Sequence, residues 1–230
     1  MQWEPKPLQS VDIVGLGASL YTLVRNTHDV FPEREPDSHQ VWTLNSGCKL
    51  LYHDVCFDIH TDEYLKLQHE AEVADGKVLH PNRVFNRRKW MKDHPGKTLV
   101  MAKADPEIPN SVTLPLKRLV EAGNCAYFDT ALAYMIASAI YLCKVESLGL
   151  YGCDYAYNIP GQTAHEHGQN CAEFWVGVAK GMGVNIYVPA LSSLLNMIQR
   201  EDGRLYGYHE PLEFTVNEDG TGKFIGPDYG

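Results

Sequence analysis

Residues 10–20 join a short apolar run to a turn that contains two glycines. Residues 11–14 have the composition of a buried strand, and Gly15, Gly17 and Ser19 follow within five residues. A strand, a glycine turn and a helix in this order open the nucleotide-binding βαβ unit of α/β proteins. Glycine lets the backbone approach a ligand, and the amides at the start of the next helix favour an anion. The segment therefore predicts a phosphate-binding turn, with Ser19 as a helix cap or a phosphate ligand.

The motif is incomplete, and one alternative stays open. Leu20 stands where the dinucleotide fingerprint G-x-G-x-x-G has its third glycine, and no lysine completes a Walker A sequence. A P-loop NTPase is therefore excluded. The alternative is a tight turn between strand and helix that binds no ligand.

Short apolar strands alternate with helical patterns through most of the chain. This order predicts an α/β, Rossmann-like fold, in which a mostly parallel sheet is covered by helices on both faces. Aromatic and turn residues after position 204 predict a C-terminal β-hairpin or arm. We expect one nucleotide-binding domain over 1–230, with its core at about 10–200 and the arm at 201–230. Strands are expected at 10–14, 39–45, 55–59, 98–102, 147–151 and 184–188, and helices at 19–25, 62–72, 83–92, 116–122, 129–144, 169–181 and 192–199.

The formal net charge of −9 argues against a protein whose whole surface binds nucleic acid. One local basic run has two interpretations. It is a solvated helix face, or it is an edge that faces a phosphate or a polynucleotide backbone. The run consists of Arg83, Arg87, Arg88, Lys89, Lys92 and Lys97.

The cysteines and the N-terminus predict where the protein resides. None of the six cysteines forms a C-x-x-C pair, and several stand in apolar runs, which is typical of buried free thiols in a reducing compartment. Residues 1–9 are polar and contain two prolines, unlike a signal peptide, and no apolar stretch reaches membrane-spanning length. The sequence therefore predicts a cytoplasmic protein without a membrane partner.

Polar residues end the second and third predicted strands. Asn45 and Ser46 end the second strand, and ligands of open parallel sheets bind beyond the carboxyl ends of strands. Asn45 is thus placed to bind a ribose or a base, or else it forms a turn. Asp58 and His60 end the third strand. Asp58 is a candidate ligand of Mg²⁺ or substrate, and the alternative is an acid at a helix N-terminus beside a surface histidine.

A second glycine turn follows the strand at 147–151. Gly152 permits close backbone approach to a nucleotide, and Asp154 is a candidate to bind a metal or to orient the substrate. The hydroxyls of Tyr155 and Tyr157 are neutral donors that can stabilise a developing phosphate charge. The alternative is a Gly-Asp turn with aromatic packing.

Two histidines flank Glu166 on a predicted loop before a helix. His165 and His167 lack a nearby third ligand, so the pattern does not specify zinc. One histidine of near-neutral pKa is better suited to act as a general acid or base. Surface histidines on a polar loop are the alternative.

Taken in order, these motifs resemble those of bacterial sialyltransferases. They are also similar to those of motility-associated glycosyltransferases and archaeal pterin pyrophosphokinases. The resemblance spans roughly residues 10–198. Its elements are Val14-Gly15-Leu16-Gly17-Ala18-Ser19-Leu20, the strand that ends at Asn45, the small-residue helix opened by Asp129-Thr130-Ala131, the strand that ends in Gly152-Cys153-Asp154-Tyr155, and Pro189-Ala190-Leu191-Ser192-Ser193-Leu194-Leu195.

The resemblance implies roles for individual residues. The nucleotide would be held by Gly17, Ser19, Asn45 and Thr130. The leaving phosphate would be contacted by Tyr155 and Tyr157. The general base would be His165 or His167. The chain departs from the sialyltransferase pattern in two places. Asp-Thr-Ala replaces Thr-Ser-Gly, and the loop that carries the histidines is much shorter.

The leading hypothesis is a glycosyltransferase-like enzyme that uses a CMP-, UDP- or GDP-linked sugar donor and a histidine base, with no required cofactor. The first alternative is a Mg²⁺-dependent pyrophosphokinase of the pterin type, with the metal on Asp58 or Asp154. The second is a nucleotide-binding protein without catalysis. The basic run adds a nucleic acid to the acceptors considered. The nucleotide base, the transferred group, the acceptor and the oligomeric state, including a homo-oligomer, stay open.

Overall fold

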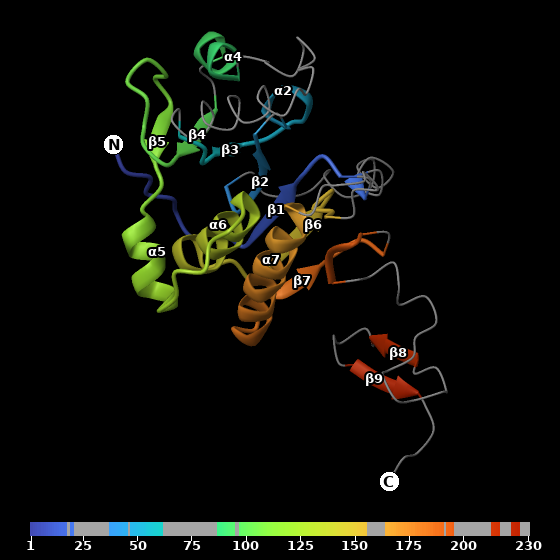
Figure 1. Cartoon of the computed structure of the whole chain (residues 1–230). Helices are drawn as coiled ribbons and strands as arrows, with labels where there is room; N and C mark the ends of the chain where they lie inside the picture. Colours follow the sequence, from blue (N-terminus) through green and yellow to red (C-terminus); the bar gives the residue numbers. More distant parts are fainter. Residues whose placement is uncertain are drawn as a thin grey trace.

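A computed structural model gives the fold of the chain (Figure 1). The predicted helix at 62–72 lies outside the part of the chain that the structure describes, and so does most of the predicted helix at 19–25. Arg83, Ser46 and Tyr157 also lie outside it. The structure describes residues 1–17, 19–20, 37–45, 47–61, 87–94, 97–155, 164–190, 192–195, 213–216 and 222–225.

The described residues form a seven-stranded sheet in which every pair of neighbouring strands is parallel. This architecture confirms the predicted α/β, Rossmann-like fold. The strand order is β5-β4-β3-β2-β1-β6-β7. The strands are β1 (Ser10–Val14), β2 (His39–Leu44), β3 (Val55–Asp58), β4 (Thr98–Met101), β5 (Ser111–Thr113), β6 (Ser147–Tyr151) and β7 (Asn185–Tyr187).

The strand order reverses beside β1. From β1 the chain moves outward to β5, and it then returns to place β6 on the other side of β1. Val14, the last residue of β1, is therefore in register with Thr43 of β2 and with Tyr151 of β6. In open α/β sheets the crevice at such a reversal, at the carboxyl ends of the strands, is the usual ligand site. The fold thus places the ends of β1 and β6 at this position.

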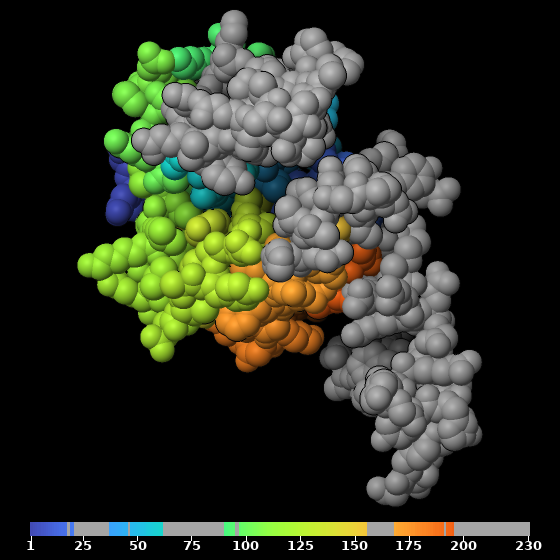
Figure 2. All heavy atoms as spheres, viewed as in Figure 1, coloured from blue at the N-terminus to red at the C-terminus, as the bar shows by residue number. Residues whose placement is uncertain are grey.

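Helices cover both faces of the sheet, as predicted. The larger core lies under α5 (Leu116–Gly123), α6 (Ala131–Ser138) and α7 (Ala164–Gly181), which bury Leu119, Met135 and Trp175 against Trp42 and Phe57. Figure 1 shows α5, α6 and α7 together on one side of the sheet. In Figure 2 their lime-to-orange atoms adjoin one another on the surface. On the opposite face, α2 (Gly47–Leu50) and α4 (Arg87–Asp93) contribute Cys48 and Met91 to a smaller core.

The structure differs from the predicted elements in four places. The long helix predicted at 129–144 is α6 followed by a π-helical turn, η2 (Ala139–Cys143). The strand β5 was not predicted, because its three residues carry no apolar run and lie at the edge of the sheet. The helix predicted from 169 begins at Ala164, so His165 and His167 stand in its first turn and not in a preceding loop. The helix predicted at 192–199 is not formed at 192–193, and its residues after 195 lie outside the described ranges.

The C-terminal hairpin is confirmed as a separate antiparallel pair, β8 (Glu213–Val216) and β9 (Gly222–Ile225). The single-domain organisation stays a prediction. None of the described helices is both long enough and apolar enough to cross a membrane.

The burial predicted for the cysteines holds for five of the six, since Cys125 is half-buried. Burial raises the pKa of the Cys143 and Cys153 thiols to about 12. At pH 8 a thiol with such a pKa is about one part in 10⁴ thiolate, the reactive form. We therefore expect iodoacetamide to alkylate Cys125 first and to leave Cys143 and Cys153 unmodified until the protein unfolds, as read by peptide mass spectrometry. Labelling of Cys153 at the rate of Cys125 would contradict this burial.

Candidate functional site

The turns after β1 and β6 contact each other directly. The Gly15 amide donates to the Tyr151 carbonyl over 2.8 Å, and the Gly17 amide donates to the Gly152 carbonyl over 2.8 Å. These bonds extend the parallel pairing of the two strands beyond their ends. The two glycine turns that the sequence predicted as separate parts of a site are therefore one hydrogen-bonded unit.

The glycines of this unit are required by the approach of the two backbones. A Cβ atom on Gly15 would lie 2.3 Å from the Gly152 carbonyl oxygen, and one on Gly17 would lie 2.5 Å from Oδ2 of Asp154. Gly152 also has φ +61°, a left-handed conformation that disfavours a side chain. The sequence assigned these glycines to ligand approach, and the structure gives them a contact with each other. The Gly15 and Gly17 amides already donate to carbonyls, so both are occupied in this structure. Phosphate binding by this turn stays a prediction.

Asp154 holds the two turns together through both of its oxygens. Oδ2 accepts from the Ser19 amide over 2.6 Å, and Oδ1 accepts from the Ser192 hydroxyl over 2.7 Å. Ser19 completes the link, because its hydroxyl oxygen accepts from the Gly152 amide over 3.0 Å. A carboxylate that accepts from an amide and a hydroxyl makes strong, charge-assisted hydrogen bonds. The geometry gives Asp154 a positioning role, and its predicted catalytic or metal-binding role is not tested.

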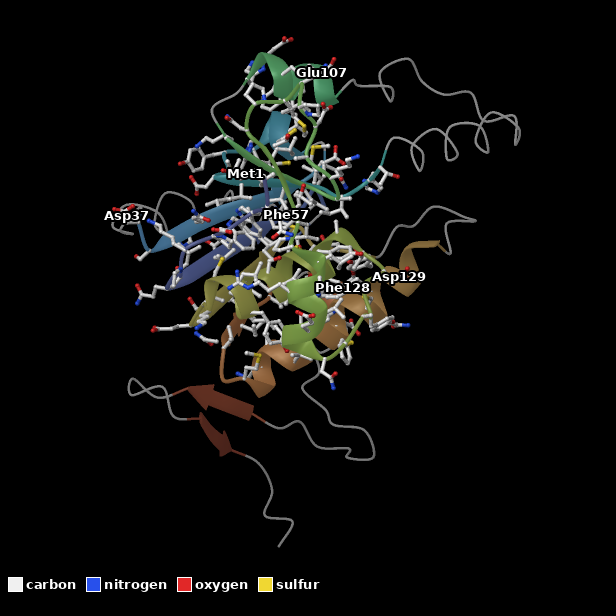
Figure 3. The ribbon with its side chains drawn as sticks, turned by 90° about the vertical axis from the view of Figure 1, so that its left-hand side faces the viewer. Met1, Asp37, Phe57, Glu107, Phe128 and Asp129 are labelled. Atoms are coloured by element: carbon white, nitrogen blue, oxygen red, sulfur yellow. The ribbon has the colours of Figure 1, made fainter. Side chains whose placement is uncertain are left out.

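Thr130 and Tyr155 are brought together as predicted for parts of one site. The Thr130 hydroxyl lies 3.1 Å from the Tyr155 hydroxyl, and the Tyr155 amide donates to the Ser193 hydroxyl over 2.8 Å. Thr130 stands at the N-cap position of α6, but its side chain makes no capping hydrogen bond. Figure 3 shows the adjacent Asp129 beside the start of α7, and the Asp129 amide donates to Sγ of Cys171 over 3.2 Å. Two neutral hydroxyls thus lie between α6, α7 and the end of β6.

Asn45 directly follows β2, the strand next to β1. It adopts φ +49°, and its amide donates to the Phe57 carbonyl over 2.9 Å. Its side-chain oxygen Oδ1 is buried and has no hydrogen-bond partner among the described residues. Buried polar atoms in native proteins are nearly always paired with a protein group or an ordered water, so this oxygen can accept a further hydrogen bond. The atom fits the hydroxyl or N–H group of a bound ligand.

Asp58 and His60 form a pair at the end of β3. The Asp58 carboxylate is buried, and its Oδ1 lies 3.4 Å from Nδ1 of His60. Within the part of the chain that the structure describes, no group of three histidine, cysteine, aspartate or glutamate residues could hold a metal ion. Mg²⁺ is usually held by one or two carboxylates together with water and substrate phosphates, so Mg²⁺ binding by Asp58 stays a prediction.

Two members of the basic run, Lys92 and Lys97, have acidic partners. Lys92 pairs with Glu107, and Lys97 lies 3.8 Å from Asp54 and 4.6 Å above the Tyr52 ring. Exposed pairs of this kind are typical of a solvated surface. For Lys92 and Lys97, a solvated surface is therefore favoured over an edge that binds a phosphate or a polynucleotide backbone.

The first turn of α7 separates the two candidate histidines. Residues two apart in a helix differ by about 200° around its axis, so positions 165 and 167 stand on nearly opposite sides. Gly168 is buried and abuts Tyr155, since a Cβ there would lie 3.1 Å from the tyrosine ring. Position 165 stands three residues before Gly168 and shares its side of the helix. Only position 165 is therefore on the side of α7 that meets Tyr155.

The structure adds residues to the site that the sequence analysis did not select. Ser192 and Ser193 bind the segment after β6, and Glu173 and Gln169 of α7 bind the segment that contains these serines. Ser192 and Ser193 occur in the last motif of the resemblance, which was the one signal available. Nothing in the pattern of α7 distinguishes Glu173 from an ordinary helix-surface acid.

Comparisons with known proteins give a similar fold among the solved structures. No family model matches the sequence, and no curated protein matches it. The solved structure of the sialyltransferase CstII from Campylobacter jejuni, in complex with the substrate analogue CMP-3FNeuAc, is similar to this chain. It is 17% identical, the match covers 83% of this chain and 84% of that chain, and the TM-score is 0.44. The resemblance to motility-associated glycosyltransferases and pterin pyrophosphokinases is not confirmed.

Proposed function

We propose that this protein transfers a sugar from a nucleotide-activated donor to an acceptor hydroxyl, at the carboxyl ends of β1, β2 and β6. One observation carries the proposal. The turn at Gly15–Gly17 follows β1, Asn45 with its orphaned Oδ1 follows β2, and Tyr155, which pairs with Thr130, follows β6, so these groups belong to the carboxyl ends of neighbouring strands where the strand order reverses. Such a convergence is the usual ligand site of this fold class.

The residues suggest how the donor would be bound. Asn45 would accept a hydrogen bond from the nucleoside, which supplies the donor that its buried oxygen lacks. The Tyr155 hydroxyl would donate to the phosphate while it accepts from the Thr130 hydroxyl, which is one of the two directions that their 3.1 Å contact allows. Fixed neutral donors of this kind stabilise the charge that develops on a leaving phosphate. The segment after β6 and the start of α6 would therefore face the reacting end of the donor.

The reaction we propose needs one base. The acceptor hydroxyl loses its proton to His165 as its oxygen forms a bond to the anomeric carbon. The bond between that carbon and the phosphate oxygen breaks, and the nucleotide leaves with the electron pair. His165 is preferred over His167 because position 165 shares the side of α7 on which Gly168 meets Tyr155.

The pyrophosphokinase alternative has less support. It requires Mg²⁺, and both oxygens of Asp154 are already hydrogen-bonded. Strict dependence on Mg²⁺ together with ATP binding would favour this alternative, and tight nucleotide binding without turnover would favour a non-catalytic protein.

A ligand screen with an Asn45 variant tests the proposal. The melting temperature is measured with CMP, UDP, GDP and ATP compounds, with Mg²⁺ and with a chelator. A ligand at a hundred times its Kd stabilises the protein by about 2.7 kcal/mol. Asn45→Gly removes the amide while glycine accepts φ +49°, and we expect it to weaken binding of the preferred nucleotide by about 5- to 30-fold, as one buried hydrogen bond is lost.

Asn124→Gly is the matched control. Asn124 has φ +45°, is exposed and follows α5, so this variant changes a similar backbone position without touching the site. It should bind the nucleotide as the wild type does. No stabilisation by any of these nucleotides, or equal loss in both variants, would contradict the proposed function.

A further inference from the structure

A chain of hydrogen bonds runs from the middle of α7 to the glycine turns. We name residues 192–195 the closing segment. Oε1 of Glu173 accepts from the Leu195 amide over 2.7 Å, which fixes one end of this segment to α7. At the other end, the Ser192 hydroxyl donates to Asp154, and the Asp154 carboxylate accepts from the Ser19 amide. Glu173 is thus connected to the turn after β1 through the closing segment.

A second branch joins the same helix to Tyr155. Nε2 of Gln169 donates to Oε1 of Glu173 over 2.8 Å and lies 3.2 Å from the Ser193 carbonyl. The Ser193 hydroxyl accepts from the Tyr155 amide. Both branches therefore meet at Glu173, on the helix whose first turn carries position 165.

The closing segment is held in an unfavourable conformation. Leu195 has φ +58°, a left-handed value that a leucine rarely adopts. Such a conformation persists only where the surroundings enforce it, and it is concentrated at functional sites. The contact of its amide with the Glu173 carboxylate is a charge-assisted hydrogen bond of the strong kind. Ser192 and Leu194 are fully buried, which prevents the segment from relaxing into solvent.

We propose that Glu173 is a positioning residue that holds the closing segment and thereby sets Asp154 and Tyr155 in place. Its role in catalysis rests on the proposed function, in which Tyr155 donates to the leaving phosphate. Glu173 does not touch the donor. It acts on the reaction through the Ser192–Asp154–Ser19 branch and the Ser193–Tyr155 branch.

Amide hydrogen exchange tests this chain of contacts without any substrate. In Glu173→Ala, we expect exchange protection of the Leu195 and Ser19 amides to fall by about tenfold or more. Glu173→Gln keeps an acceptor oxygen at Oε1 and should keep both amides protected. Ser192→Ala cuts the chain in the middle, so it should expose the Ser19 amide and leave the Leu195 amide protected.

The set of amides that lose protection in each variant distinguishes a positioning role of Glu173 from a general loss of stability. Glu121→Ala, which removes an exposed glutamate from α5, is the control and should change neither amide. If Glu173→Ala exposes Leu195 while Ser19 and Tyr155 stay protected, the proposal is overturned. If Glu173→Ala does not fold, Ser192→Ala and Glu173→Gln carry the same test, and unchanged Ser19 protection in Ser192→Ala overturns it.

Turnover supplies the second readout. With an active sugar-nucleotide donor, Glu173→Ala should lower kcat by about tenfold with little change in the acceptor KM. The reason is that a misplaced Tyr155 hydroxyl would no longer stabilise the charge on the leaving phosphate in the transition state. The double variant Glu173→Ala with Ser192→Ala should lose no more than the worse single variant, since both act through one chain. Strictly additive losses contradict the proposal. An inactive wild type would refute the proposed function, while the exchange pattern would still decide the role of Glu173.

Discussion

Gly15→Ala is expected to lower the free energy of unfolding by about 1–3 kcal/mol, the usual cost of forcing an extra methyl group into a packed site. The added Cβ would lie 2.3 Å from the Gly152 carbonyl oxygen and 3.0 Å from its carbon. Both neighbours are backbone atoms fixed by the pairing of β1 with β6, so neither can rotate away. The turns would have to separate, and nucleotide binding should be lost with them. Urea unfolding and the ligand screen measure the two effects.

Gly177→Ala is the matched control for this prediction. Gly177 lies inside α7, and a Cβ there would meet nothing within 4 Å. Replacing an exposed helical glycine by alanine stabilises a protein by about 0.5–1 kcal/mol. The two substitutions are chemically identical and should have opposite signs. Equal stability of Gly15→Ala and the wild type would show that the two turns do not approach as closely as described.

His165→Ala is expected to reduce kcat by about 10² to 10⁴, the usual contribution of a general base. The reason is the position of residue 165 on the side of α7 that meets Tyr155. His167→Ala, two residues away, should keep kcat within a few-fold of the wild type. The measurement is steady-state transfer with the nucleotide sugar identified by the ligand screen.

Two outcomes of the histidine comparison would change the mechanism. A large loss in His167→Ala and none in His165→Ala would place the base on the other side of α7. Near-full rates in both variants would remove histidine base catalysis. Both proteins should retain the melting temperature of the wild type to within a few degrees, which distinguishes loss of a base from loss of fold.

The sequence predicted the sheet well where a strand is buried. Val11, Ile13, Leu148 and Leu150 are almost fully buried in the structure, and such apolar runs are typical of the central strands of a parallel sheet. The edge strand β5 was missed because edge strands need less apolar surface. The start of α7 was missed because its first residues, rich in histidine and glycine, are poor helix formers. There the packing of Gly168 against Tyr155 is a tertiary effect that local sequence does not carry.

The sequence predicted which residues lie at the candidate site, but it did not predict the contacts between them. Residues at the ends of parallel strands meet at one edge of a sheet, so Asn45 and the two glycine turns could be expected there. Local patterns do not reveal contacts between distant segments. Ser19 and Asp154 are 135 residues apart in the sequence, and nothing in either motif indicates that one binds the other. The chain of hydrogen bonds from Glu173 to Ser19 joins residues that are 22, 38 and 135 positions apart in the sequence. It was therefore not foreseen.

The placement of β1 between β2 and β6 sets the order in which the chain can fold during synthesis. The portion from β1 to β5 leaves the ribosome first and can pair with itself, while the second edge of β1 stays open. An open strand edge binds other chains readily, and pairing across a long sequence separation is slow. The Gly15 and Gly17 amides find their acceptors only when β6 emerges, and the Asp154 link closes only after Ser192 has been made. A nascent chain stopped just before residue 192 would contain all seven strands of the sheet but not the Asp154–Ser192 link.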